Sequence, residues 1–172
     1  MMVFDLDPGA PATIRDCAKI AIELRDLLSG LGLRSFPKTS GGKGLHVVVP
    51  LNGGTAFAAA KPFAHVIAEL LARRHPDHVT SVMAKSGRIG KVFIDWSQND
   101  HGKTTACVYT LRAQSRPTVS VPLAWAEVER AREQPEPGLL VFEADKALER
   151  SERMGDLFKP VLTLRQRLPA DS

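Results

Sequence analysis

The order of strand-like and helix-like segments restricts most strongly what this chain can fold into. Short apolar runs typical of strands recur along it, at residues 3–6, 34–38, 45–51, 79–83, 91–95 and 104–111. Residues 14–31 and 62–71 instead carry apolar side chains at helical spacing. The order strand–helix–strand–strand–helix–strand predicts an α/β sandwich, with a mostly antiparallel sheet where short loops join the strands.

Local signals place some boundaries of these elements. Thr13 is a candidate cap for the first helix, and Gly30 or Gly32 a candidate end. Pro62 is expected to begin or kink the second helix. The remaining elements are expected at the C-terminal end: a helix near Trp125–Arg132, a proline-rich break at Pro135–Pro137, and one or two helices from Glu143 to about Arg167.

Composition excludes several classes of protein. A chain of 172 residues suits one domain, over residues 1–172, with a sizeable core. No apolar run reaches the roughly 18 residues that a membrane span needs, and the first residues do not resemble a signal peptide. Cys17 and Cys107 lack metal-ligand spacing and cannot build a disulfide framework, so reduced thiols in a cytoplasmic protein are expected.

The basic charge is concentrated in the middle of the chain. Residues 34–112 contain 11 Lys/Arg and 4 Asp/Glu, a net charge of +7, whereas the rest has 12 and 15, a net charge of −3. A basic middle between acidic ends favours a polyanionic ligand such as nucleic acid or a nucleotide. A solvated basic face without a partner is the alternative.

Three aspartates are candidate metal ligands. Asp5 and Asp7 are two residues apart on a predicted strand, so both carboxylates project from one face. Asp95 ends the apolar run Val92-Phe93-Ile94, where a carboxylate is costly unless it is paired, hydrogen-bonded or metal-bound. Carboxylates on adjacent strand ends suit a pair of divalent cations. The alternatives are a solvated turn that caps a helix and a satisfied structural aspartate.

The segment Ser40-Gly41-Gly42-Lys43-Gly44 is a candidate phosphate-binding loop. Closely spaced glycines let backbone N–H groups approach a phosphate, and Lys43 adds a positive charge. The spacing differs from a Walker loop, and the segment leads into a strand that carries His46. A flexible hairpin with a surface lysine is the alternative.

Arg88, Gln98 and Arg112 lie near strand-like sequence that can converge on Asp95. Guanidinium groups match phosphate oxygens in geometry, so both arginines are candidate phosphate ligands. Routine surface arginines and a polar turn at Gln98-Asn99 are the alternatives.

Three long motifs, in this order, resemble the polymerase domain of bacterial ligase D, a member of the archaeo-eukaryotic primase superfamily. They are Phe4-Asp5-Leu6-Asp7-Pro8-Gly9, Lys38-Thr39-Ser40-Gly41-Gly42-Lys43-Gly44-Leu45-His46-Val47 and Val92-Phe93-Ile94-Asp95-Trp96-Ser97-Gln98-Asn99. The similarity continues through residues 109–113 and 119–125. It implies a primase-like two-layer sandwich with a mostly antiparallel mixed sheet and flanking helices.

The resemblance also implies a role for each candidate residue. Asp5, Asp7 and Asp95 match the family's metal-binding carboxylates. Six positions match residues that contact the incoming nucleotide or its triphosphate: Ser40, Lys43, His46, Arg88, Gln98 and Arg112. The implied cofactors are two divalent metal ions, Mn²⁺ or Mg²⁺, and the implied substrate is a nucleoside triphosphate.

The implied activity is that of a primase-like nucleotidyltransferase acting in non-homologous end-joining repair. It would add ribo- or deoxyribonucleotides at DNA ends or gaps, in the cytoplasm at the bacterial nucleoid. A non-catalytic nucleotide- or DNA-binding remnant that needs a partner chain is the alternative, and a two-metal phosphoesterase is a third. Expected partners are DNA, end-joining proteins and a separate N-terminal or ligase chain, or a second copy of the chain.

The sequence departs from the family's pattern in places. In the family a substantial segment precedes the Asp-x-Asp strand, whereas this sequence begins almost at Asp5. Ala126 stands where an acidic residue is usual, and Gln114-Ser115-Arg116 replaces an Arg-Pro-Gly-like run. We therefore expect metal and triphosphate binding to be retained and templated extension to be weak or absent.

Overall fold

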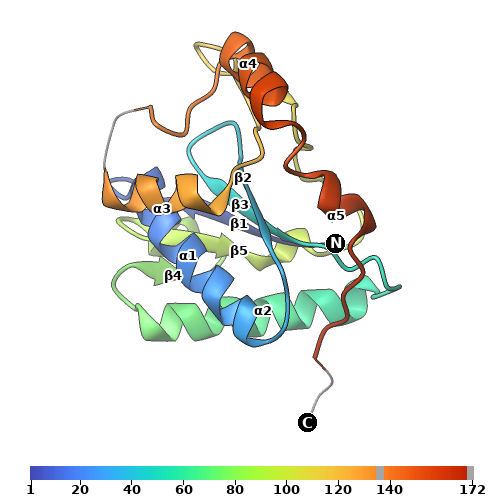
Figure 1. The fold of residues 1–172 in the computed structure, drawn as a ribbon. Coiled ribbons are helices and arrows are strands. Elements are labelled where there is room, and N and C mark those ends of the chain that lie inside the picture. Colours follow the sequence, from blue (N-terminus) through green and yellow to red (C-terminus); the bar gives the residue numbers. More distant parts are fainter. Residues whose placement is uncertain (135–137, 170–172) are drawn as a thin grey trace.

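A computed structural model describes residues 1–134 and 138–169 and shows a sheet layered with helices (Figure 1). The sheet has five strands in the order β2-β3-β1-β5-β4. Their bounds are β1 Met2–Pro8, β2 Phe36–Thr39, β3 Leu45–Val49, β4 Val79–Thr80 and β5 Val92–Asp95. Every neighbouring pair is antiparallel except β4 and β5. The predicted α/β class and mostly antiparallel sheet are confirmed.

The helices α1 and α2 pack on the sheet and, together with α3, form its main hydrophobic core (Figure 1). The helices are α1 Ile14–Gly30, α2 Phe57–Arg74, α3 Trp125–Glu133, α4 Ala144–Met154 and α5 Lys159–Thr163. Met2, Phe4 and Leu6 of β1 point into this core and are 0% exposed. Burying each such side chain contributes roughly 1.5–3 kcal/mol. Alternate residues of β1 therefore anchor the strand to the helices.

The opposite face of the sheet is divided between packing and polar groups. Val3 and Val48 pack there against Val161 of α5, with Phe36 and Phe158 beside them. Further along β1, the same face carries Asp5 and Asp7. One end of this face is therefore a small core, and the other end is polar.

The sequence signals predicted the boundaries of α1 correctly but not the start of α2. The Thr13 N–H donates to the Asp16 carboxylate at 2.9 Å, and α1 ends at Gly30, as predicted. Pro62 does not begin α2, because the helix starts at Phe57 and includes the proline. The carbonyl that Pro62 leaves without a helical partner belongs to Ala58, an exposed residue, where water can satisfy it.

Two predicted strands required correction. Residues 104–110 form no strand, and only Leu111–Arg112 (β6) pairs, with Thr118–Val119 (β7). Tyr109 adopts a left-handed backbone with φ of 63°, which interrupts an extended chain. The strand expected at 79–83 stops at Thr80, whose hydroxyl accepts the Val82 N–H and so competes with the ladder. The strands expected at 3–6, 34–38, 45–51 and 91–95 are present with shifted bounds.

The helices predicted in the C-terminal part of the chain are present. The helix expected near Trp125–Arg132 is α3, and the segment from Glu143 to Arg167 contains α4 and α5. The proline-rich break at Pro135–Pro137 lies outside the described residues. Among the residues that are described, no helix is both long and apolar enough to cross a membrane.

Asn99 completes the pairing of β1 beyond the end of β5. Its side-chain oxygen accepts the Val3 N–H at 2.7 Å, and its side-chain nitrogen donates to the Val3 carbonyl at 2.7 Å. The residue is only 3% exposed. Both backbone groups of Val3 are therefore satisfied by one side chain.

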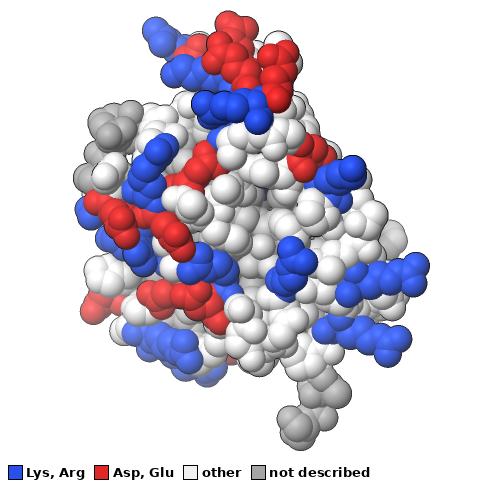
Figure 2. Space-filling view, viewed as in Figure 1, with Lys and Arg blue, Asp and Glu red and all other residues white. Residues whose placement is uncertain are grey.

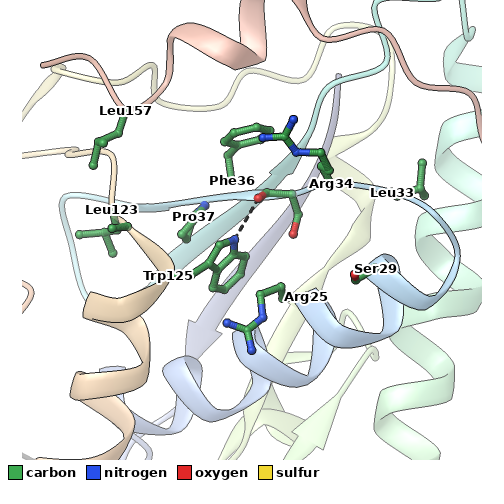
Figure 3. A pocket seen from close by; sticks show the side chains of 11 residues that line it. Arg25, Ser29, Leu33, Arg34, Phe36, Pro37, Leu123, Trp125 and Leu157 are labelled. Carbon is green, nitrogen blue, oxygen red and sulfur yellow. Dashed lines mark hydrogen bonds between the residues drawn. The ribbon is translucent and has the colours of Figure 1, made fainter.

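Charges of both signs are interspersed over the face of the molecule that carries α1, α3 and α4 (Figure 2). A pocket of about 330 Å³ lies here among α1, β2 and α3 (Figure 3). The Trp125 indole N–H donates to the Ser35 carbonyl at 3.0 Å, and the Arg25 guanidinium lies 5.2 Å from the indole centre. None of the site residues predicted from sequence lines this pocket.

Candidate active site

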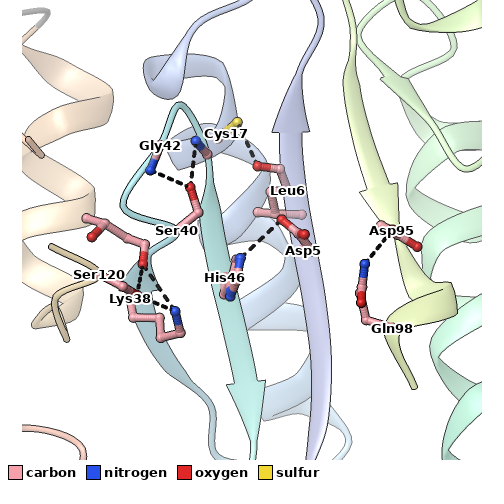
Figure 4. A network of polar contacts seen from close by, with 12 residues as sticks. Asp5, Leu6, Cys17, Lys38, Ser40, Gly42, His46, Asp95, Gln98 and Ser120 are labelled. Atoms are coloured by element: carbon pink, nitrogen blue, oxygen red, sulfur yellow. Dashed lines mark hydrogen bonds and ion pairs between the residues drawn. The ribbon is translucent and has the colours of Figure 1, made fainter. Parts of the chain in front are cut away.

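Four strands bring a row of polar side chains onto one face of the sheet. The register pairs Lys38 with His46, His46 with Asp5, and Asp5 with Asp95. Directly opposed residues project from the same face. The His46 Nε2 lies 3.3 Å from the Asp5 Oδ1, and His46 is only 4% exposed (Figure 4). Asp5 thus contacts an imidazole on one side and faces Asp95 on the other.

Asp7 projects from the same face as Asp5, two residues further along β1. It makes no hydrogen bond within the described residues. The pKa of its carboxyl is raised above the ordinary value, first by partial loss of hydration and then by the negative charge of Asp5. Lys43 and Arg88 oppose this rise in pKa. A carboxylate without hydrogen bonds, beside another carboxylate, is electrostatically suited to a cation.

Residues 40–44, the glycine-rich loop, are held by Ser40. Its Oγ accepts the N–H groups of Gly42 at 3.1 Å and Gly44 at 3.2 Å (Figure 4). These two amides are therefore engaged within the loop. A Cβ on Gly44 would lie 2.2 Å from the Leu6 carbonyl oxygen, so only glycine allows the loop to approach β1 this closely.

One pocket of about 390 Å³ gathers most of the predicted site residues; we call it the carboxylate pocket. Those that line it are Asp5, Asp7, Ser40, Lys43, His46, Gln98 and Arg112. Thr104, Thr105, Ala106 and Gln114 also line it and were not predicted. The threonines lay in a segment interpreted as a strand, and Gln114 in a run noted only as a departure from the family.

Asp95 and Arg88 do not line the carboxylate pocket. One Asp95 oxygen accepts the N–H and the hydroxyl of Ser97, at 2.9 and 2.6 Å, and the other accepts the Gln98 side-chain amide at 2.9 Å. The Arg88 guanidinium lies 3.5 Å from the centre of the Phe93 ring and donates to the Met83 carbonyl at 2.5 Å. Arg88 thus acts on Asp7 through its charge.

The carboxylates fit a divalent cation in their chemistry, because Mg²⁺ and Mn²⁺ prefer hard oxygen ligands. Within residues 1–134 and 138–169, however, no three His, Cys, Asp or Glu side chains converge closely enough to hold a metal ion. Asp5 and Asp7 share the pocket, whereas both oxygens of Asp95 accept hydrogen bonds. The side chains therefore offer two carboxylates toward the pocket and a third on the neighbouring strand.

Neither cysteine lines the carboxylate pocket. Cys17 and Cys107 are free thiols, and Cys17 is buried while Cys107 is exposed. The Cys17 Sγ donates to the Leu6 carbonyl at 3.4 Å, and burial raises the pKa of this thiol well above its ordinary value. Cys17 is therefore a neutral core residue beneath the site.

The sequence model of a protein family, the LigD primase-polymerase domain, matches residues 1–158 of this chain. The chain belongs to this family. It is 43% identical over 171 residues to the multifunctional non-homologous end joining DNA repair protein LigD of Mycobacterium tuberculosis, covering 99% of this chain and 21% of that protein. The LigD of Bacillus subtilis, named as bifunctional, is 32% identical over 155 residues, which cover 90% of this chain and 24% of that protein.

A solved structure of a LigD polymerase domain has the same fold. It is the polymerase domain from Mycobacterium tuberculosis ligase D in complex with DNA, with a TM-score of 0.85 and 43% identity. The match covers 93% of this chain and 54% of the solved chain. The predicted family resemblance is confirmed. The chain spans only about a fifth of the length of the mycobacterial LigD protein, the share being 21%.

Proposed function

We propose that this chain is a metal-dependent nucleotidyltransferase that adds ribo- or deoxyribonucleotides at DNA ends or gaps in non-homologous end joining. One observation carries the proposal: Asp5 and Asp7 line the same pocket as Lys43 and Arg112. Carboxylates beside cationic side chains suit a triphosphate that reaches the protein both directly and through metal ions. Membership of the LigD primase-polymerase domain family supports this assignment.

The side chains of the carboxylate pocket that were predicted from sequence each have a part in the proposed reaction, in which a primer 3′-hydroxyl attacks the α-phosphate of a nucleotide. When bound, two Mn²⁺ or Mg²⁺ ions would activate the hydroxyl and stabilise the leaving pyrophosphate. Asp5 and Asp7 would hold the cations, and Lys43 and Arg112 would neutralise charge on the phosphates. The Ser40 Oγ keeps the loop in place, because it accepts two of the loop's own amides.

Asp95, Arg88, His46 and Gln98 complete the proposed set. Asp95 would be the third metal ligand, from its position directly opposite Asp5 on the next strand, once its carboxylate turned from Ser97 and Gln98 toward the cation. Arg88 supports the triphosphate through its charge near Asp7. His46 contacts the nucleotide from the pocket wall, and Gln98 orients the Asp95 carboxylate by its hydrogen bond of 2.9 Å.

The proposed partner is DNA, as primer-template or broken ends. The solved polymerase domain of Mycobacterium tuberculosis ligase D is in complex with DNA, which supports this choice. A non-catalytic nucleotide- or DNA-binding chain that needs a partner is the second candidate. It is favoured by the hydrogen bonds that occupy both oxygens of Asp95, because within the described residues no three metal-ligating side chains converge. End-joining proteins, a separate N-terminal or ligase chain, and self-association remain predictions.

Primer extension with Mn²⁺ on gapped and blunt-ended DNA tests the proposal. The wild-type chain should add nucleotides, and Asp7→Asn should not, while Asp77→Asn at an exposed turn serves as the control. ATP and Mn²⁺ binding without extension would favour the non-catalytic candidate. Release of nucleoside monophosphates from the DNA would instead indicate a phosphoesterase.

A further inference from the structure

Lys38 of β2 is a buried cation at the end of the polar row. It is only 2% exposed, and its Nζ donates to the Ser120 Oγ at 2.5 Å and to the Thr39 carbonyl at 3.2 Å (Figure 4). Burying an ammonium group costs free energy unless its protons are satisfied. A methionine of similar length would fill the same space without that cost, so packing alone does not explain a lysine here.

Ser120 transmits the contact to another part of the chain. Its Oγ donates to the Thr39 carbonyl at 2.7 Å, so Lys38 and Ser120 together fix this point of β2. The Ser120 backbone pairs with the segment before Arg112: its N–H donates to the Thr110 carbonyl at 3.0 Å, and its carbonyl accepts the Tyr109 N–H at 2.7 Å. Ser120 thus joins β2 to the start of the β6–β7 hairpin.

The β6–β7 hairpin, residues 111–119, carries Arg112 into the carboxylate pocket. Arg112 pairs with Thr118 across the hairpin, and the Thr118 hydroxyl donates to the Gly41 carbonyl. A Cβ on Gly41 would lie 2.5 Å from the Arg112 Cγ, so the arginine stem packs directly on the glycine-rich loop. The placement of Arg112 therefore depends on how this hairpin is held.

We propose that Lys38 is a positioning residue for Arg112, which acts through Ser120 to hold the β6–β7 hairpin against the glycine-rich loop. By fixing Arg112, it sets the affinity of the carboxylate pocket for a nucleoside triphosphate. The effect on the triphosphate rests on the proposed function, whereas the effect on the hairpin does not.

The charges around Lys38 agree with this role. Burial lowers the pKa of Lys38 to about 8, while Asp5 and Cys107 raise it and Arg112 lowers it further. His46 stands between Lys38 and Asp5 in the row. The Lys38 ammonium therefore interacts through its charge with both Asp5 and Arg112. Its direct hydrogen bonds go to the neutral oxygens of Ser120 and Thr39.

Two variants separate positioning from charge. Lys38→Met removes the ammonium, whereas Ser120→Ala keeps the charge and removes the hydroxyl that joins both Lys38 and the Thr39 carbonyl to the hairpin. Hydrogen exchange at the Tyr109 and Ser120 amides reports on the hairpin, and calorimetric titration with ATP and Mn²⁺ reports on affinity. Lys91→Met is the matched control, because the Lys91 Nζ donates to the Pro76 carbonyl at 2.6 Å outside the pocket.

Both Lys38→Met and Ser120→Ala should speed exchange at the two amides and weaken ATP binding about tenfold, the effect of roughly one hydrogen bond. Lys91→Met should change neither. If Ser120→Ala keeps the wild-type exchange rates and ATP affinity, the proposal is overturned. This test holds even if Lys38→Met fails to fold. If the wild-type chain binds no ATP, the proposed function and the affinity claim fail, and amide exchange alone decides the claim about the hairpin.

Discussion

Asp5 and Asp95 lie directly opposite each other on β1 and β5, with both carboxylates on one face of the sheet. Like charges at such a position are destabilising on their own. The structure supports each carboxylate separately, since His46 contacts Asp5, and Ser97 and Gln98 donate to Asp95. A site that keeps like charges this close can be stabilised by adding cations.

Mn²⁺ should therefore raise the thermal midpoint of the wild-type chain. A ligand that binds only the folded state at about 100 times its dissociation constant stabilises it by about 2.7 kcal/mol. Asp7→Ala should abolish the rise, and Asp77→Ala should leave it intact. Differential scanning fluorimetry with increasing Mn²⁺ checks this, and an equal rise in Asp7→Ala would contradict the metal assignment.

Lys43→Ala and Arg112→Ala should each weaken nucleotide binding. Loss of one charge-assisted contact costs on the order of 1.5–3 kcal/mol. Both residues are exposed at the pocket, so neither change should lower the thermal midpoint appreciably. Titration with ATP measures the effect, with the exposed Lys146→Ala as control. Wild-type affinity in both variants would count against the carboxylate pocket as the triphosphate site.

Gly44→Ala should destabilise the fold, while Gly42→Ala should be tolerated. The added methyl group at Gly44 would lie 2.2 Å from a backbone oxygen of Leu6, whereas at Gly42 the nearest atom is 3.5 Å away. Overpacking of this kind costs roughly 1–3 kcal/mol. Urea unfolding of the two variants compares them directly, and equal midpoints would show that the loop does not need its close approach to β1.

Stability should rise with pH on account of Lys38. Burial lowers its pKa from 10.5 to about 8, so between these values the unfolded chain holds a proton that the folded chain has lost. Unfolding then takes up a proton, and the free energy of unfolding increases with pH. Below the folded pKa both states are protonated, and the cost of the buried charge, about 3 kcal/mol, is fully present.

Urea unfolding at about pH 7.5 and about pH 10 measures this dependence. The difference in unfolding free energy between wild type and Lys38→Met isolates the lysine, because all other titrating groups are shared. That difference should move in favour of the wild type as the pH rises. A difference that stays constant would mean that Lys38 is better hydrated than its burial indicates.

Much of the candidate site was accessible from sequence because its residues lie on regular elements. The two-residue period of a strand puts Asp5 and Asp7 on one face, and the glycine spacing marks residues 40–44 as a loop. The pairing of Asp5 with Asp95 follows from sheet order, which local patterns do not specify. The resemblance to the family supplied that connection.

Other features depend on tertiary contacts that no local pattern encodes. A lysine in a short strand is expected to face solvent. Lys38 is nevertheless buried, because residues 119–121 cover it. The β-branched residues near Tyr109 favour a strand, but the Tyr109 N–H bonds to Ser120 in a left-handed conformation instead. The Arg88 guanidinium lies over the Phe93 ring, a contact that the sequence around Arg88 does not indicate.

Asn99 has an effect that reaches beyond its own hydrogen bonds. The side-chain amide of Asn99 takes the place of a peptide unit opposite Val3. The interior strand β5 can therefore end before β1 does without leaving the backbone groups of Val3 unpaired. The strand β5 ends at Asp95, and the main chain then forms a short 3₁₀ turn at Trp96–Gln98. The polar residues that support the Asp95 carboxylate can therefore come from the next turn of the chain, and no distant segment is needed to supply them.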